Sequence, residues 1–420
     1  MNIMEPEQLQ SVRSRITHTL FVTQALFGAT QVAAFTVVPI LAAQLSDSER
    51  MTGVPMTIAF LARSISAFPF GWIMDRLGRR AGLTAGYLSS LIAAAASFFS
   101  VAVHSFAGFC VASFFAGMAR SSSEQARFIG AEIYPETERA RIIGRIVSAG
   151  TISAIGGAMM VAPAGIWIAQ YGYPPMSGPF VVGVGLSLAA VLLTLFLVRP
   201  DPLDLARRIK PSAESEIDAS TTRPVREILR NVHVRYGIAA MVIGQFVMTL
   251  LMVITPLHMS HHDHGTWLIS WVIMAHAIGM FGVSGITGRL IIRWGQHAIV
   301  KWGVLILVVS CVITPVSPRF IPLTIALFLL GLGWNFCFIA GSSLLSNALA
   351  PLERGRVQGV NEMFIALSAS SASLVTGFLF ESGGMLLLAV IGTVCSVGLG
   401  FCSLVYSRRT GRGTLAEAAG

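Results

Sequence analysis

Long apolar runs alternate with short polar stretches along the whole chain. An α-helix needs about 20 mostly apolar residues to cross a bilayer. Twelve runs approach or exceed that length, at 17–44, 51–74, 81–103, 105–127, 142–169, 178–198, 234–257, 267–292, 298–316, 320–347, 357–380 and 384–406. The pattern predicts an all-α membrane protein with twelve transmembrane helices.

A charged stretch interrupted by prolines, residues 199–233, separates six of these runs from the other six. Such composition is typical of a linker. We therefore expect an N-terminal six-helix bundle over 1–198, a cytoplasmic linker over 199–233 and a C-terminal six-helix bundle over 234–420.

Only 12% of the residues are charged and 54% are hydrophobic. A soluble domain carries about 25% charged residues, so a water-facing surface is excluded for most of this chain. The net charge of +9 comes from basic residues gathered in alternate loops. By the positive-inside rule this places both termini and the linker in the cytoplasm, and no nucleic-acid binding is expected.

The two halves resemble each other. Gly71 and the following Arg76-Leu77-Gly78 recur as Gly288 and Arg293-Trp294-Gly295. The stretch 135–144 has a shorter echo in 351–359, at nearly the same offset. Repeats of this kind are how many transporters build two bundles around a midplane site, so the bundles are expected to be pseudo-symmetric.

One loop carries a family motif, read as G-x-x-x-D-R-x-G-R-R. It consists of Gly71, Asp75, Arg76, Gly78, Arg79 and Arg80. The loop resembles the connection between helices 2 and 3 of major facilitator superfamily transporters, and the resemblance extends over essentially the whole chain. It implies alternating access between two bundles, in the inner membrane of a bacterium.

The resemblance also implies roles within the motif. Gly71 would pack closely against helix 11, and Asp75 would face the amino end of that helix, where a carboxylate is stabilised, and so latch the cytoplasmic side. The three arginines would pair with acids or lipid phosphates, or act only as determinants of topology. Ile292 replaces the aspartate in the second half, so the latch is expected to be one-sided.

Two hallmarks of drug–proton antiporters in the superfamily are missing. Ser113 stands where helix 4 would carry an arginine, and Ala158 stands where helix 5 would carry a proline. The runs 255–257 and 331–336 resemble a group of bacterial facilitators that includes vitamin and drug carriers. The sequence therefore does not decide between a vitamin and a drug as the substrate.

Polar residues at membrane depth are costly and are functional candidates by default. We expect substrate contacts from Gln31, Gln245, His276, Trp334 and Asn335. The alternative for the amides is interhelical hydrogen bonding. Trp334 would stack on a planar ligand or lie in the core or against lipid.

Arg63 lies near the middle of the second run and cannot lose its charge. No acid is evident at a comparable depth on a neighbouring run. We therefore expect carbonyls, water or an anionic substrate to compensate the charge, which favours an anionic or carboxylated substrate.

Arg120, Glu124 and Arg127 share one face of the fourth run. We expect Arg120 and Glu124 to pair, either as a proton-coupling site or as a static salt bridge. Glu132, near the end of that run, is expected to contribute to a gate or to loop packing.

A histidine-rich stretch, 261–264, falls in the loop after the seventh run. Imidazole and carboxylate groups can bind zinc, nickel or copper or sense pH. Without a distant ligand we expect a solvated loop and no metal site.

These features predict a secondary transporter for a small organic solute, coupled to protons. The alternatives are multidrug efflux by proton antiport and a membrane sensor or scaffold that does not transport. No nucleotide-binding loop and no catalytic constellation occur, so neither enzyme activity nor a cofactor is expected. The expected partners are a small-molecule substrate and membrane lipids, and the expected state is a monomer.

Overall fold

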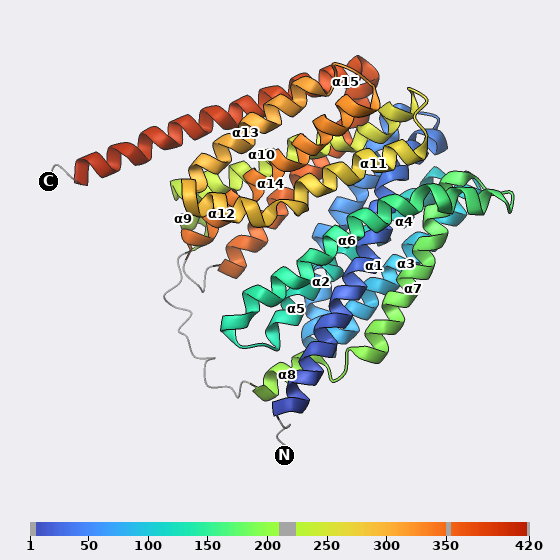
Figure 1. Cartoon of the computed structure of the whole chain (residues 1–420), viewed down its shortest axis with the longest axis horizontal. Helices are drawn as coiled ribbons and strands as arrows, with labels where there is room; N and C mark the ends of the chain where they lie inside the picture. The colour runs from blue at the N-terminus through green and yellow to red at the C-terminus, as the bar shows by residue number, and fades with distance from the viewer. Residues whose placement is uncertain (1–5, 210–223, 350–353, 418–420) are drawn as a thin grey trace. The chain divides into compact units, whose positions relative to one another are not determined.

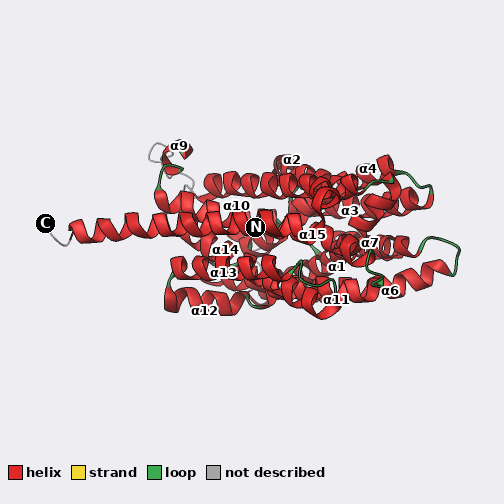
Figure 2. Cartoon of the chain, turned by 90° about the horizontal axis from the view of Figure 1, so that it is seen from above, coloured by secondary structure: helices red, strands yellow, loops and turns green. Residues whose placement is uncertain are grey.

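The computed structural model describes residues 6–209, 224–349 and 354–417. Within these ranges every regular element is a helix (Figure 2). The middle of the expected linker and the residues Pro351, Leu352 and Glu353 of the second loop motif lie outside them. The all-helical class predicted from the apolar runs is confirmed.

The chain forms two compact units. Unit 1 holds α1 (Pro6–Ser46), α2 (Val54–Leu77), α3 (Arg79–Ala102), α4 (Phe106–Ser123), α5 (Ala126–Glu132), α6 (Glu136–Ala169), η2 (Pro175–Ser177), α7 (Gly178–Leu197) and α8 (Pro202–Ile209). Figure 1 shows α8 at the end of unit 1 where α1 begins.

Unit 2 holds η1 (Glu49–Gly53), α9 (Val225–Ile228), α10 (Val232–Ser260), α11 (Thr266–Ala277), η4 (Ile278–Gly282), α12 (Ser284–Trp294), α13 (Gln296–Ile313), α14 (Phe320–Asn347) and α15 (Arg354–Glu417). The short helix η1, which connects α1 to α2 in sequence, therefore packs with unit 2.

Nine helices of the described ranges are long and apolar enough to span a membrane, or ten if the bent pair α11–η4 and α12 counts as one span. In α15 the backbone is not helical at Gly383 and Gly384, which divides that helix into two. With α4, each of the twelve apolar runs coincides with a helix.

The core of unit 1 at the α8 end is apolar. Leu205 of α8 is buried in one cluster with Ile16, Leu20, Met74 and Leu83. The linker therefore begins as a short helix packed into unit 1.

In unit 2, α11 continues into a π-helix at η4, and the span bends by 42° before α12. A π-helix is frequently found at functional sites because it frees a backbone carbonyl from the regular ladder. Glycines let α14 approach closely here, since a Cβ on Gly331 would fall on the carbonyl oxygen of His276.

Candidate functional site

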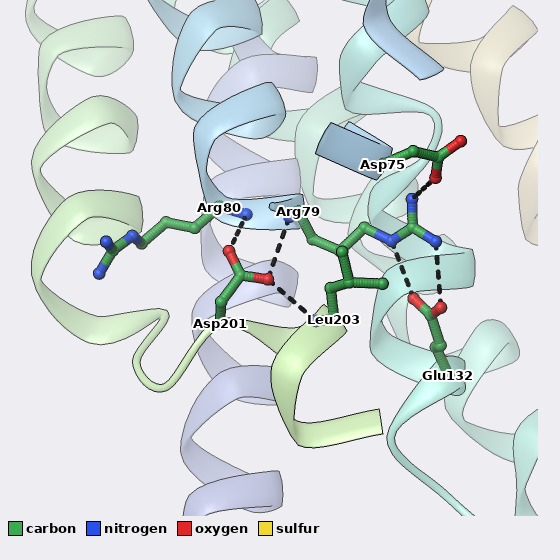
Figure 3. Close-up of polar contacts among 6 residues, drawn as sticks. All are labelled: Asp75, Arg79, Arg80, Glu132, Asp201 and Leu203. Atoms are coloured by element: carbon green, nitrogen blue, oxygen red, sulfur yellow. Dashed lines mark hydrogen bonds and ion pairs between the residues drawn. The ribbon is translucent and has the colours of Figure 1, made fainter. Parts of the chain in front are cut away.

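Arg79 lies at the centre of a carboxylate cluster at the loop between α2 and α3 (Figure 3). Its Nε and Nη2 donate to the two oxygens of Glu132, each at 3.0 Å. Its Nη1 donates to Asp75 Oδ1 at 2.7 Å. The Asp75 side chain is 69% exposed against 30% for Glu132, so Asp75 is the more easily released partner.

A third carboxylate, Asp201, reaches the same loop from the start of the linker. It accepts from the backbone amides of Arg79 and Arg80, both at 3.0 Å, and from that of Leu203 at 2.9 Å (Figure 3). Composition placed Asp201 in a linker and pointed to no contact.

The other motif residues take different positions. Arg76 lies over the Trp72 ring, 4.6 Å from its centroid. The Arg80 side chain extends away from the cluster (Figure 3). A Cβ on Gly71 would meet no atom of unit 1, so the close packing expected of this glycine stays a prediction.

A cavity of about 630 Å³ opens beside this cluster, between α5, α6 and α8. Its lining includes Arg79, Arg139, Arg207, Gln125 and Glu132. Glu132 is engaged by Arg79, so the remaining polar groups of the lining are mainly guanidinium groups. The rest of the lining is apolar and includes Met74, Phe128 and Ile143.

The expectation that Arg63 has no acid at its depth is wrong. Arg63 Nε and Nη2 each lie 2.9 Å from Glu124 Oε2. Arg120 Nε donates to the other oxygen of Glu124 at 3.2 Å, which is the pair that the spacing predicted. Glu124 follows α4 directly, and an arginine side chain on α2 is long enough to reach it.

Further polar contacts in unit 1 join α1, α3 and α4. The Ser123 hydroxyl donates to the Gln24 side-chain oxygen, and the Tyr87 hydroxyl donates to Thr23 at 3.1 Å. Gln31 is half-buried on α1. Gln24 lies two helical turns from Gln31 on the same face of α1, so helical spacing was the signal that could have found it.

In unit 2 the predicted residues Gln245 and Trp334 contact each other. Trp334 Nε1 donates to Gln245 Oε1 at 3.0 Å, and Gln245 Nε2 donates to Thr249 at 3.0 Å. The Trp334 ring stacks on Phe338 with centroids 4.6 Å apart. Both polar groups of Gln245 are thus bonded within unit 2, and a substrate contact from Gln245 stays a prediction.

Asn335 holds the bend in the α11–α12 span. Its amide nitrogen donates to the Met280 carbonyl at 2.6 Å and to Ser284 Oγ at 2.9 Å, and its oxygen accepts from Thr287 at 2.6 Å. The side chain is 1% exposed. It therefore stabilises the π-helix from the neighbouring α14.

His276 is buried just before the π-helix. Its Nδ1 lies 2.9 Å from the Leu327 carbonyl oxygen, so Nδ1 carries the proton and donates. Its Nε2 is buried with no hydrogen-bond partner among the described residues. This leaves one acceptor available at the bend.

The histidine-rich stretch after α10 makes separate contacts. His261 Nε2 lies 3.4 Å from Glu49 Oε1 of η1, and His264 Nε2 lies 2.8 Å from the Pro318 carbonyl. In the described ranges no group of three or more metal-binding side chains comes together.

Comparison with known proteins decides the family. The sequence model of the Major Facilitator Superfamily matches residues 20–318 and, in a second match, 268–419. The chain belongs to the Major Facilitator Superfamily. It is therefore a multi-pass membrane protein of a family that transports small solutes and does not comprise enzymes.

Several relatives within this superfamily align over most of the chain. The MFS-type transporter YdeG of Bacillus subtilis is 29% identical over 94% of this chain and 92% of its own length. The riboflavin transporter RfnT of Brucella anthropi is 29% identical over 87% of this chain and 89% of its own.

Solved structures of two transporters share the fold. The nucleoside transporter NupG has a TM-score of 0.66 at 15% identity, with 94% of this chain and 98% of NupG covered. The bacterial homologue of the human lysosomal transporter Spinster, inward-facing and unoccupied, has a TM-score of 0.72 at 14% identity, with 97% and 98% covered.

Proposed function

We propose that this protein is a proton-coupled secondary transporter that moves a small organic anion, carboxylated or otherwise, across the inner membrane by alternating access. The observation that carries the proposal is the cluster of Arg63, Arg120 and Glu124 inside unit 1. Ionisable residues at this depth mark substrate and proton pathways in membrane proteins.

The cluster is suited to an anion. Arg63 and Arg120 both direct guanidinium groups at one carboxylate, and Arg127 lies one turn further along with its Nε making no hydrogen bond to the described residues. Guanidinium groups bind carboxylates and phosphates in a planar, often bidentate geometry. A substrate carboxylate would find in this cluster the same donors that Glu124 now uses.

Glu124 is the residue that would couple transport to protons. A proton on its carboxylate removes the charge that both arginines contact, and so releases their donors for the substrate anion. Loss of the proton restores the two ion pairs and favours release. Proton and anion would then move in the same direction.

Asp75 and Arg79 would form the gate. The Asp75 carboxylate is largely exposed and bound only at one guanidinium nitrogen, while Glu132 binds two. Asp75 can therefore leave Arg79 for a helix N-terminus, where a carboxylate is stabilised, while Arg79 stays anchored.

A second candidate substrate class is a flavin. One relative is named a riboflavin transporter, and unit 2 contains the Trp334–Phe338 stack with the Gln245 amide beside it. A planar ring could take the place of Phe338 against Trp334. Flavin mononucleotide carries a phosphate in addition to the planar ring and is therefore also a small organic anion.

The test is a thermal-shift screen of the purified protein, followed by uptake into proteoliposomes. The probes are small carboxylates, riboflavin, flavin mononucleotide and lipophilic cations. A ligand at one hundred times its dissociation constant stabilises by about 2.7 kcal/mol. Anions should stabilise the wild type and not Arg63→Ala.

Arg50→Ala is the matched control, since Arg50 also pairs with a glutamate, Glu381, but 58% of its side chain is exposed. It should keep the anion response. Stabilisation by lipophilic cations alone would favour multidrug efflux. Binding without flux under any gradient would favour a sensor.

A further inference from the structure

We propose that Asp201 is a positioning residue that fastens the start of the linker to the loop between α2 and α3. Its carboxylate caps two helices at once. The first amides of a helix have no partner within that helix. Asp201 accepts from the first two amides of α3, those of Arg79 and Arg80, and from the Leu203 amide in the first turn of α8 (Figure 3).

Gly78 makes room for this carboxylate. Its φ is +97°, in the left-handed region that favours glycine. A Cβ at this position would fall on the Asp201 carboxylate, so a side chain would displace it. The carboxylate could move aside only by giving up its bonds to the amides. Gly78 is therefore required for space as well as for backbone conformation.

The corresponding loop of unit 2 has the same backbone without the carboxylate. Gly295 precedes α13 with φ +82° and ψ 155°, close to the +97° and 159° of Gly78. A Cβ on Gly295 would meet no atom within 4 Å. The clip formed by Asp201 on the amides of Arg79, Arg80 and Leu203 thus distinguishes the two halves of the repeat.

Neighbouring contacts hold the linker start in the same place. Arg15 Nη2 of α1 donates to the Arg199 carbonyl, and Leu205 of α8 is 2% exposed. Asp201 lies between these two anchors. The first turn of the linker is therefore part of unit 1.

The clip acts on the residue at the centre of the motif. Asp201 holds the backbone of Arg79, while Glu132 and Asp75 bind its side chain. The position of the guanidinium thus depends on the linker carboxylate. Resting on the proposed function, we infer that Asp201 sets the rate at which Asp75 exchanges partners.

Hydrogen exchange of the full-length protein in detergent tests the contact directly. Asp201→Ala should speed exchange of the Arg79, Arg80 and Leu203 amides roughly 10- to 100-fold, as expected for a lost bond to a charged acceptor. Asp201→Asn keeps one acceptor oxygen and should give an intermediate effect. Asp204 is an exposed aspartate of α8, and Asp204→Ala should leave the exchange rates of all three amides unchanged.

A double-mutant cycle separates positioning from general stability. Gly78→Ala should lower the melting temperature more in the wild type than in Asp201→Ala, because the clash exists only when the carboxylate is present. Gly295→Ala should cost the same in both backgrounds. Equal costs for Gly78→Ala in both, with unchanged amide exchange, would overturn the proposal.

Transport kinetics test whether Asp201 affects gating. Once a substrate is identified, Asp201→Ala should lower kcat several-fold and leave KM unchanged, since its carboxylate contacts the amides of Arg79, Arg80 and Leu203 and none of the described residues of the Arg63 cluster. An unchanged kcat with faster amide exchange would overturn the effect on gating but not the clip. If the wild type transports nothing, the proposed function fails and the exchange and cycle results still stand.

Discussion

Arg63 on α2 and Glu124 at the end of α4 form an ion pair across 61 positions of sequence, with two guanidinium nitrogens 2.9 Å from one carboxylate oxygen. The pair is extended by Arg120, which binds the other oxygen. One carboxylate of unit 1 therefore serves two arginines.

Because Arg63 and Arg120 share the Glu124 carboxylate, the variants at these positions should differ in stability. Glu124→Ala should lower the apparent melting temperature in detergent more than Arg63→Ala, because it removes both ion pairs while the arginine variant leaves Glu124 with Arg120. The coupling energy between positions 63 and 124 should be about 0.5 to 3 kcal/mol, as for residues in one ion-pair network. Glu138→Ala, an exposed glutamate of α6, serves as the control and should have little effect. Equal effects of the two single variants would contradict the shared carboxylate.

The motif cluster predicts different costs for its two acidic partners. Glu132→Gln should destabilise by about 1.5 to 3 kcal/mol, because Glu132 accepts two charge-assisted bonds from Arg79. Asp75→Asn should cost only about 0.2 to 1 kcal/mol, as for an exposed pair. Thermal unfolding of both variants in one detergent makes the comparison. A larger cost for Asp75→Asn would refute the assignment of Glu132 as the fixed anchor.

Asn335 should be needed for the bend in the α11–α12 span. Asn335→Leu removes three hydrogen bonds, and at about 0.6 kcal/mol each it should destabilise by about 2 kcal/mol. Asn347→Leu changes the exposed last residue of the same helix and should cost little. Thermal unfolding is again the measurement, and similar losses for both asparagines would argue against the clamp.

Close backbone packing of η1 predicts the effect of a single methyl group. Gly377→Ala would place a Cβ on the carbonyl oxygens of Arg50 and Glu49, which cannot move without the η1 backbone, and should destabilise by about 1 to 3 kcal/mol. Gly398→Ala, in open space on the same α15, should instead stabilise by about 0.5 to 1 kcal/mol. Losses of equal size at both glycines would show that η1 does not pack as described.

The family motif can be recognised from the sequence because its residues are close together and their spacing is local. The residues that bind the motif cannot be recognised in this way. Glu132 lies 53 positions from Arg79, and Asp201 lies 122 positions away. The helix order alone does not say which side chains from α5 and the linker reach the loop.

The polar residues inside the bundles show the same division. Hydropathy identifies Arg63, Gln245, His276 and Asn335 as unusual, since any polar group in an apolar run is conspicuous. Gln24, which accepts from Ser123, is not among the predicted contacts although it lies two turns from Gln31 on α1. Which amides bond within the protein depends on how the helices pack.

The sequence by itself determined the membrane class, the positions of the twelve spans and the superfamily, because apolar run length and loop motifs are local properties of a chain. Only the tertiary structure decided that Glu124 neutralises Arg63, that Asp201 caps α3, and that Asn335 clamps a π-helix. Each of these depends on helix depth, rotation and side-chain reach, which are set when helices pack and not by the residues of any one helix.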